Sequence, residues 1–109
     1  MKYIKTFENL NDEPKNGEYL ILEINNANKI KTIAKITSNS RDSIAHKYSK
    51  VFNTYDILGD YDSDIYYNYK DNFYFYASGI RCYILFKSFD KNEILNIFEM
   101  MNNINKYNL

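Results

Sequence analysis

The segment Asp62–Phe86, DSDIYYNYKDNFYFYASGIRCYILF, holds half of the chain's 12 tyrosines and decides the fold. Over residues 65–70, 73–76 and 80–87 the side chains alternate in character with a period of two, which is the period of a β-strand. Turn-forming pairs, Asp71-Asn72 and Ser78-Gly79, separate the three runs. The segment therefore predicts an antiparallel meander, and we expect its tyrosines to leave a row of phenolic rings uncovered on the outer face.

Two further strands are predicted before this segment. Residues 14–17, PKNG, have the composition of a turn, and Gly17 can adopt the positive φ that such a turn needs. The run EYLILEI at 18–24 is rich in strand-forming residues, and Asn25–Asn28 then reverse the chain into KIKTIAKIT at 29–37. Residues 39–55 fit both a helical face and an alternating strand. For them we favour a short helix or an irregular start followed by a strand.

The C-terminal segment predicts an amphipathic helix. Asp90 can serve as its N-cap, with Glu93 three residues later in a capping box, and Phe89 can pack on Ile94 as a hydrophobic staple. Apolar side chains then recur at steps of three and four residues. They are Ile94, Ile97, Phe98, Met101 and Ile104.

Length and composition predict one domain spanning residues 1–109. Together with the elements above they predict an α+β fold: a small antiparallel sheet or SH3-like barrel of about five or six strands with a C-terminal amphipathic helix. Cys82 is the only cysteine, so no internal disulfide can form, and we expect it to pack as a small hydrophobe in a reducing compartment. No apolar run has the length of a signal peptide or a membrane span, so a cytoplasmic location and no membrane partner are expected.

Charge is balanced overall but unevenly distributed along the chain. The formal net charge is +0, which excludes a global attraction to nucleic acid. Residues 29–50 nevertheless hold six basic side chains against Asp42 alone, whereas residues 56–71 hold five aspartates against Lys70 alone. This asymmetry indicates either two solvated segments or two surfaces for charged partners.

No motif predicts catalysis, a metal or a cofactor. DYDSD at 60–64 resembles the start of a calcium loop, but Ile65 stands where that loop needs glycine and Asp71 replaces its final glutamate. His46 is the only histidine and has no sequence neighbour that would make it a metal ligand or a catalytic base. Three glycines are too few for a phosphate-binding loop motif. We therefore expect a protein that is not an enzyme.

Three stretches carry a resemblance to a known group: PKNGEYLILEI at 14–24, TIAKI at 32–36 and GIRCYILFKSFDKNEILNIFE at 79–99. They resemble small proteins carried by phages of AT-rich bacteria, although Ala34 stands where that group has a glycine and the middle third has no counterpart. The resemblance implies a small SH3-like or Tudor-like barrel with a terminal helix. Phage proteins of this size are similar in kind to inhibitors of host defence, anti-CRISPR proteins among them, which occupy a surface of a host nuclease or its RNA complex.

Two functions are compatible with these features. The first is a non-enzymatic inhibitor that docks on a host protein or ribonucleoprotein complex, with direct RNA contact as one variant. Its expected contact residues are Tyr66, Tyr67, Tyr69, Tyr74, Tyr76, Asp60, Asp62 and Asp64. The alternative is an SH3-like module that binds nucleic acid through the basic segment. Its expected contacts are Lys29, Lys31, Lys35, Arg41, Lys47, Tyr48 and Lys50.

Overall fold

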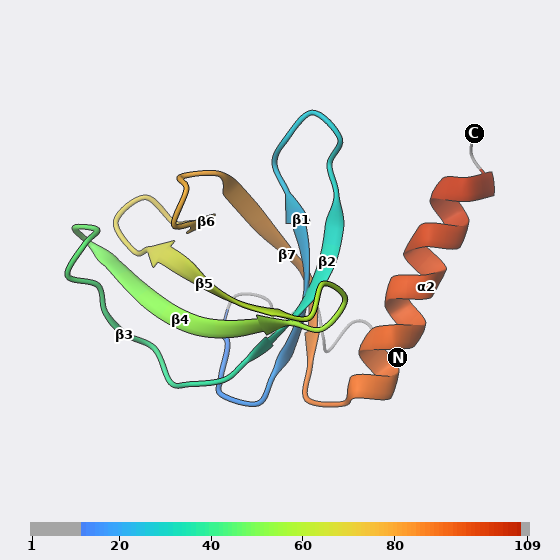
Figure 1. The fold of residues 1–109 in the computed structure, drawn as a ribbon, viewed down its shortest axis with the longest axis horizontal. Helices are drawn as coiled ribbons and strands as arrows, with labels where there is room; N and C mark the ends of the chain where they lie inside the picture. The colour runs from blue at the N-terminus through green and yellow to red at the C-terminus, as the bar shows by residue number, and fades with distance from the viewer. Residues whose placement is uncertain (1–11, 108–109) are drawn as a thin grey trace.

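The computed structural model describes residues 12–107, with side chains to residue 102 (Figure 1). Its elements are β1 (Tyr19–Ile24), β2 (Lys31–Ile36), β3 (Arg41–Asp42), β4 (Ser49–Asp56), β5 (Tyr61–Asn68), β6 (Phe73–Tyr76), β7 (Arg81–Ser88) and α2 (Lys91–Tyr107). The strands lie in the order β2-β1-β7-β6-β5-β4-β3, and β2 also pairs with β4. That pairing closes six antiparallel strands into a barrel and leaves β3 as an extra strand beside β4. The predicted α+β class, a small antiparallel barrel with a C-terminal helix, is confirmed.

The N-terminal hairpin forms as predicted. β1 and β2 pair antiparallel with Ile21 opposite Ile33. Gly17 has a φ of 91° and its N–H donates to the Ile36 carbonyl at 2.8 Å, so the turn before β1 also anchors the end of β2. A residue with a side chain would be strained at this φ, which explains the glycine.

The tyrosine-rich segment forms the predicted meander. β5 pairs with β4 over eight residues, from Ser49 opposite Asn68 to Asp56 opposite Tyr61. β6 pairs with β5 on one side and with β7 on the other. Asn72 in the β5–β6 turn and Gly79 in the β6–β7 turn have positive φ. Each residue belongs to a turn pair that the sequence predicts.

Residues 39–55 contain strands and no helix. β3 covers two residues, the chain then passes through bends and turns to residue 48, and β4 begins at Ser49. An irregular start followed by a strand is thus correct, and the short helix is not formed. β4 pairs with β5 on one side and with β2 and β3 on the other, so its backbone groups are satisfied by neighbouring strands rather than within a helical turn.

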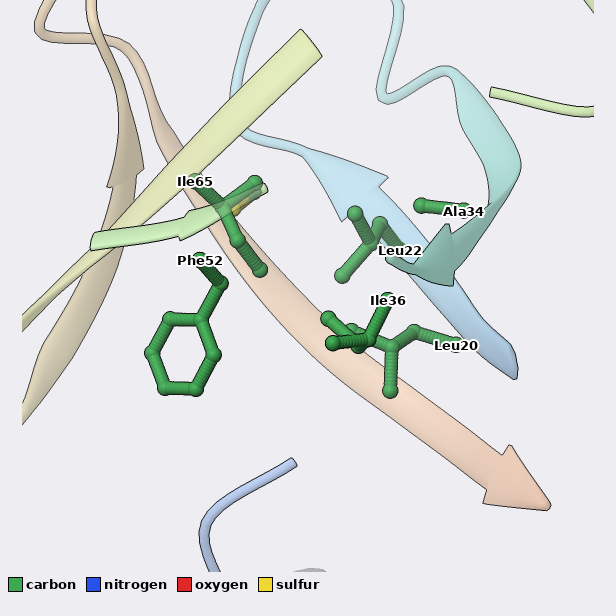
Figure 2. Close-up of a cluster of buried hydrophobic side chains, with 7 residues drawn as sticks. Leu20, Leu22, Ala34, Ile36, Phe52 and Ile65 are labelled. Atoms are coloured by element: carbon green, nitrogen blue, oxygen red, sulfur yellow. The ribbon is translucent and has the colours of Figure 1, made fainter. Parts of the chain in front are cut away.

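Two apolar cores hold the fold together. The first fills the barrel, where side chains from five strands converge (Figure 2). Its buried members are Leu20, Leu22, Ala34, Ile36, Phe52, Ile65 and Cys82. The second lies on the outer face of the β1, β2 and β7 wall, which α2 covers (Figure 1). Its buried members are Ile21, Ile33, Phe86, Ile94 and Ile97. Alternate residues of β1 thus serve both cores, as the strand period requires.

The helix begins where the sequence predicts. Asp90 Oδ1 accepts hydrogen bonds from the backbone N–H groups of Asn92 and Glu93, at 2.9 and 3.3 Å, which confirms Asp90 as the N-cap. The backbone N–H of Asp90 itself donates to Ser88 Oγ at 3.0 Å. Ile94 and Ile97 are buried, and Phe98 and Met101 pack beside them. The side chain of Ile104, the last member of the predicted stripe, lies outside the described residues.

Candidate functional site

The expected row of uncovered tyrosines does not exist, and this expectation was wrong. Tyr67, Tyr74 and Tyr76 pack against the core inside the barrel. The register explains their position: Tyr67 follows the buried Ile65 by two residues and so faces the same way, and β6 places Tyr76 opposite Ile65 and Tyr74 opposite Tyr67. Half-buried rings of this kind mainly stabilise the barrel.

The other two tyrosines of the predicted contact set, Tyr66 and Tyr69, do not pack against the barrel core. Tyr66 stacks on Phe75, with ring centroids 5.3 Å apart, and His46 meets both rings edge-on at 4.6 and 5.1 Å. His46 therefore covers an outer aromatic layer of the sheet. Tyr69 is 49 % exposed and is the one tyrosine of the predicted contact set that the structure leaves exposed.

The three aspartates of the predicted contact set lie in the half of the β4–β5 hairpin remote from Tyr69. Asp60 accepts a hydrogen bond from the Tyr55 hydroxyl, and Asp64 accepts one from Asn53 Nδ2 at 2.8 Å. Asp62 and Asp64 line a polar hollow of about 310 Å³ together with Thr37, Ser38, Asn53 and Thr54. Within residues 12–102 no group of three or more His, Cys, Asp and Glu side chains is placed to hold a metal ion.

The structure disperses most of the predicted basic contacts. Lys31 forms an ion pair with Glu23 at 3.7 Å, and the Lys35 ammonium lies 5.5 Å from the centre of the Tyr19 ring. Arg41 Nη1 donates to Asn53 Oδ1 at 2.6 Å, beside the acidic hollow. Lys29, with a φ of 48°, lies in the β1–β2 turn. None of these interactions joins two of the four side chains.

Lys47, Tyr48 and Lys50 instead gather with Tyr69 and Lys70 at one end of the barrel. The Tyr69 N–H donates to the Tyr48 carbonyl at 3.0 Å, and the two rings meet edge to face with centroids 6.4 Å apart. The ammonium groups of Lys70 and Lys47 lie 4.8 and 5.6 Å from the centre of the Tyr48 ring. We call these five residues the Tyr48–Tyr69 surface.

The backbone at Tyr48 is strained. Its φ is 58°, in the left-handed region that a bulky side chain rarely adopts. The ring is 45 % exposed, so burial in a core does not account for this conformation. Strain of this kind persists where the surrounding structure enforces it and is concentrated at functional sites. Among the four non-glycine residues with positive φ in the described part of the chain, Tyr48 is the aromatic one, and its exposed ring favours a functional role.

A hollow of about 190 Å³ opens next to this surface and is lined by Glu13, Lys50, Tyr67, Tyr69 and Tyr74. Lys50 Nζ lies 3.7 Å from Glu13 Oε1, which also accepts a hydrogen bond from Ser40 Oγ at 2.6 Å. Burial, with a smaller contribution from Tyr67, raises the pKa of Tyr74. This phenol therefore stays neutral at physiological pH, so the walls of the hollow are aromatic with one ammonium and one carboxylate at the rim.

Other buried ionisable groups serve the fold. Asp56 accepts hydrogen bonds from Thr32 Oγ1 and from the N–H groups of Leu58 and Gly59, at 2.6, 3.0 and 2.8 Å. Burial lowers the pKa of Lys87, whose ammonium donates to the Asp12 carbonyl at 2.6 Å. Burial also raises the pKa of the Cys82 thiol to about 12, so this thiol is a poor nucleophile.

Sequence reasoning placed Tyr48 and Tyr69 in two different hypotheses and missed Lys70. The signal that joins them is the strand register, because Tyr48 directly precedes β4 and Tyr69 directly follows β5. No family model, curated protein or solved structure matches this chain. In the part of the chain that the structure describes, no helix combines the length and the apolar character needed to cross a bilayer.

Proposed function

We propose that this chain is a non-enzymatic binding protein that docks on a host nuclease or RNA–protein complex, in the manner of phage-encoded inhibitors of host defence such as anti-CRISPR proteins. The observation that carries the proposal is the Tyr48–Tyr69 surface, where two half-exposed tyrosines and three lysines converge. Exposed tyrosines that present a large ring with few rotatable bonds are common anchors of interfaces.

The arrangement of these side chains favours binding for a second reason. The two rings already contact each other within the protein, and the bond from the Tyr69 N–H to the Tyr48 carbonyl holds their backbones side by side. Ordering side chains on association opposes binding by about 0.5–1.5 kcal/mol for each. Rings that are positioned before the partner arrives avoid most of that loss.

The acidic residues of the β4–β5 hairpin favour a large partner, because they lie far from Tyr69. Asp62 and Tyr69 are separated by most of β5, which corresponds to roughly 23 Å along an extended strand. A partner that contacts both must be as wide as a standard protein interface. A nuclease complex has that size, and its basic grooves would complement Asp62 and Asp64.

The test is capture of the partner and inhibition of its activity, measured with variants matched for exposure. Tyr69→Ala removes a ring that is 49 % exposed at the candidate surface, whereas Tyr83→Ala removes one that is 47 % exposed on β7. The unchanged protein and Tyr83→Ala should retain the same host complex from lysate and inhibit the purified complex, and Tyr69→Ala should do neither. Equal retention by all three proteins, or no inhibition by any of them, would contradict the proposal.

A further inference from the structure

The side chains at the Tyr48–Tyr69 surface combine aromatic rings with positive charge. Lys47 and Lys70 are exposed and both place their ammonium groups near the Tyr48 ring. Contacts between an ammonium and an aromatic ring at an exposed site are weak, so either lysine can turn to a phosphate without disturbing the fold. Proteins that bind single-stranded nucleic acid use this pairing of cations for the backbone with aromatic rings for the bases.

The hollow beside the surface supplies a place for one base. Tyr69 belongs both to the surface and to the wall of the hollow, and Lys50 lies at the same rim. A planar ring that enters the hollow would stack against the exposed face of Tyr69, and Lys50 would meet the phosphate attached to it. Glu13, which is ion-paired with Lys50 at this hollow, can accept a hydrogen bond from an exocyclic amino group of the base.

We infer that the Tyr48–Tyr69 surface binds a single strand of nucleic acid, with one base against Tyr69 at the hollow and adjacent phosphates on Lys47, Lys50 and Lys70. The inference rests on the proposed function and deepens it, because it identifies the bound part of an RNA–protein complex as an unpaired RNA segment. A duplex fits less well, since its bases are stacked on one another and offer no free face to a tyrosine.

The position of the acidic cluster favours this choice. The lysines Lys47, Lys50 and Lys70 have three carboxylates nearby: Glu13 beside Lys50, Asp42 opposite Lys50 in the strand register, and Asp71 next to Lys70 in the chain. The cluster of Asp60, Asp62 and Asp64, which would repel phosphate, lies in the remote half of the β4–β5 hairpin. Arg41, Lys31 and Lys35 neither line the hollow nor contact Tyr48 or Tyr69, so the proposed footprint is the three phosphates at Lys47, Lys50 and Lys70.

The experiment is fluorescence anisotropy of the purified full-length chain with labelled single-stranded RNA of about 12 nucleotides and with the matching duplex. We expect tighter binding to the single strand. Three phosphate contacts predict a slope of about −2 for the logarithm of affinity against the logarithm of salt concentration. That slope corresponds to a fall of roughly 20-fold between 50 and 200 mM salt.

Variants distinguish the contribution of base stacking to RNA affinity from the contribution of the lysine charges. Tyr69→Ala should weaken binding roughly 5- to 150-fold, the range for the loss of one stacked base, with the salt slope unchanged. Lys70→Gln should reduce the slope by about 0.7. Tyr83→Ala and Lys29→Gln, which change the same side-chain types on β7 and on the β1–β2 turn, should leave affinity and slope unaltered. Thermal melts followed by circular dichroism verify that each variant is folded.

Two outcomes would overturn the inference: no binding of the single strand at about 50 mM salt, or binding that Tyr69→Ala and Tyr83→Ala affect equally. The proposed function can be judged separately from these results. If RNA is not bound while Tyr69→Ala still abolishes capture of the host complex, the surface docks on protein, and only the nucleic-acid inference falls. If RNA binding and capture both fail, both proposals fall.

Discussion

The rings of Tyr48 and Tyr69 meet edge to face because each stands just outside one end of the longest strand pairing in the barrel. Ser49, the first residue of β4, is the register partner of Asn68, the last residue of β5. The residues directly before and after this pair must therefore lie side by side, and the Tyr69 N–H donates to the Tyr48 carbonyl at 3.0 Å. The candidate surface is thus fixed to the end of the β4–β5 pairing: Lys50 lies in β4, and the other four residues lie directly before β4 or after β5.

Tyr48→Asn tests whether the strained backbone conformation at Tyr48 serves binding of the partner rather than stability of the fold. Asparagine tolerates the left-handed conformation better than tyrosine, which offsets the loss of an aromatic contact of about 0.5–1.5 kcal/mol. We expect the free energy of unfolding to change by less than about 1 kcal/mol, while capture of the partner is lost. Urea unfolding and the capture assay measure the two effects. A loss of several kcal/mol in stability would instead make Tyr48 a structural residue.

Ile94→Ala and Leu95→Ala test the packing of α2 on the barrel. Ile94 is fully buried in the outer core, whereas its neighbour Leu95 is 37 % exposed. Truncation of a buried isoleucine lowers the free energy of unfolding by about 2–5 kcal/mol, and we expect Leu95→Ala to lower it by less than about 1 kcal/mol. Chemical denaturation of both variants gives the comparison. Similar small losses for both would mean that the helix contributes little to the barrel.

Local patterns were sufficient to predict β1, β2, β5, β6, β7 and α2. The period of two in residues 65–87, the turn pair Ser78-Gly79 and the N-cap at Asp90 are read within a few residues, and the elements they predict are present. Residues 39–55 were ambiguous because their apolar residues fit both periods. β2 and β5, which pair with β4 on either side, decided between strand and helix there, and that pairing is not visible in a local window.

The face of the sheet that each tyrosine occupies could not be predicted. Both alternating sets of β6 are aromatic, and each alternating set of β5 carries a tyrosine, so the tyrosines alone do not show which face turns inward. Barrel closure decides the matter, because the pairing of β2 with β4 encloses the face that carries Ile65 and Tyr67. The approach of Tyr48 to Tyr69 depends on the same long-range register, which is why the candidate surface could not be assembled from the sequence.

Asp56→Ala tests the carboxylate that ties β2 to the β4–β5 turn. The variant would leave the buried Thr32 hydroxyl and the N–H groups of Leu58 and Gly59 without their acceptor. Hydrogen bonds to a charged acceptor contribute about 1.5–3 kcal/mol each, so we expect the free energy of unfolding to fall by about 3 kcal/mol or more.

Two variants control for the loss of charge at Asp56. Asp56→Asn keeps one acceptor oxygen and should recover part of the stability. Asp62→Ala removes an exposed carboxylate from the same hairpin and should change stability by less than about 0.5 kcal/mol. Equal effects of Asp56→Ala and Asp62→Ala in urea unfolding would show that charge, not hydrogen bonding, matters at this turn.

Cys82→Ala tests the buried thiol through the pH dependence of stability. Burial raises the pKa of Cys82 from 9.0 to about 12, so above about pH 9 the unfolded chain releases a proton that the native chain keeps. The stability that depends on this thiol is thus complete below pH 9 and is lost as the pH rises toward 12, with a slope of about 1.4 kcal/mol per pH unit.

Other groups with shifted pKa values also contribute to the pH dependence of stability, so Cys82→Ala removes only part of that dependence. The raised pKa values of Tyr74 and Tyr76 act in the same direction at higher pH, while the lowered pKa of Lys87 acts in the opposite direction. Urea unfolding from about pH 8 to about pH 11 should therefore show a shallower alkaline decline for Cys82→Ala than for the unchanged chain, and not its disappearance. The comparison of slopes cancels the constant loss of packing caused by the smaller side chain. Identical slopes for the two proteins would mean that the thiol ionises freely in the folded barrel, and that the interior around Leu22 and Ile65 admits water.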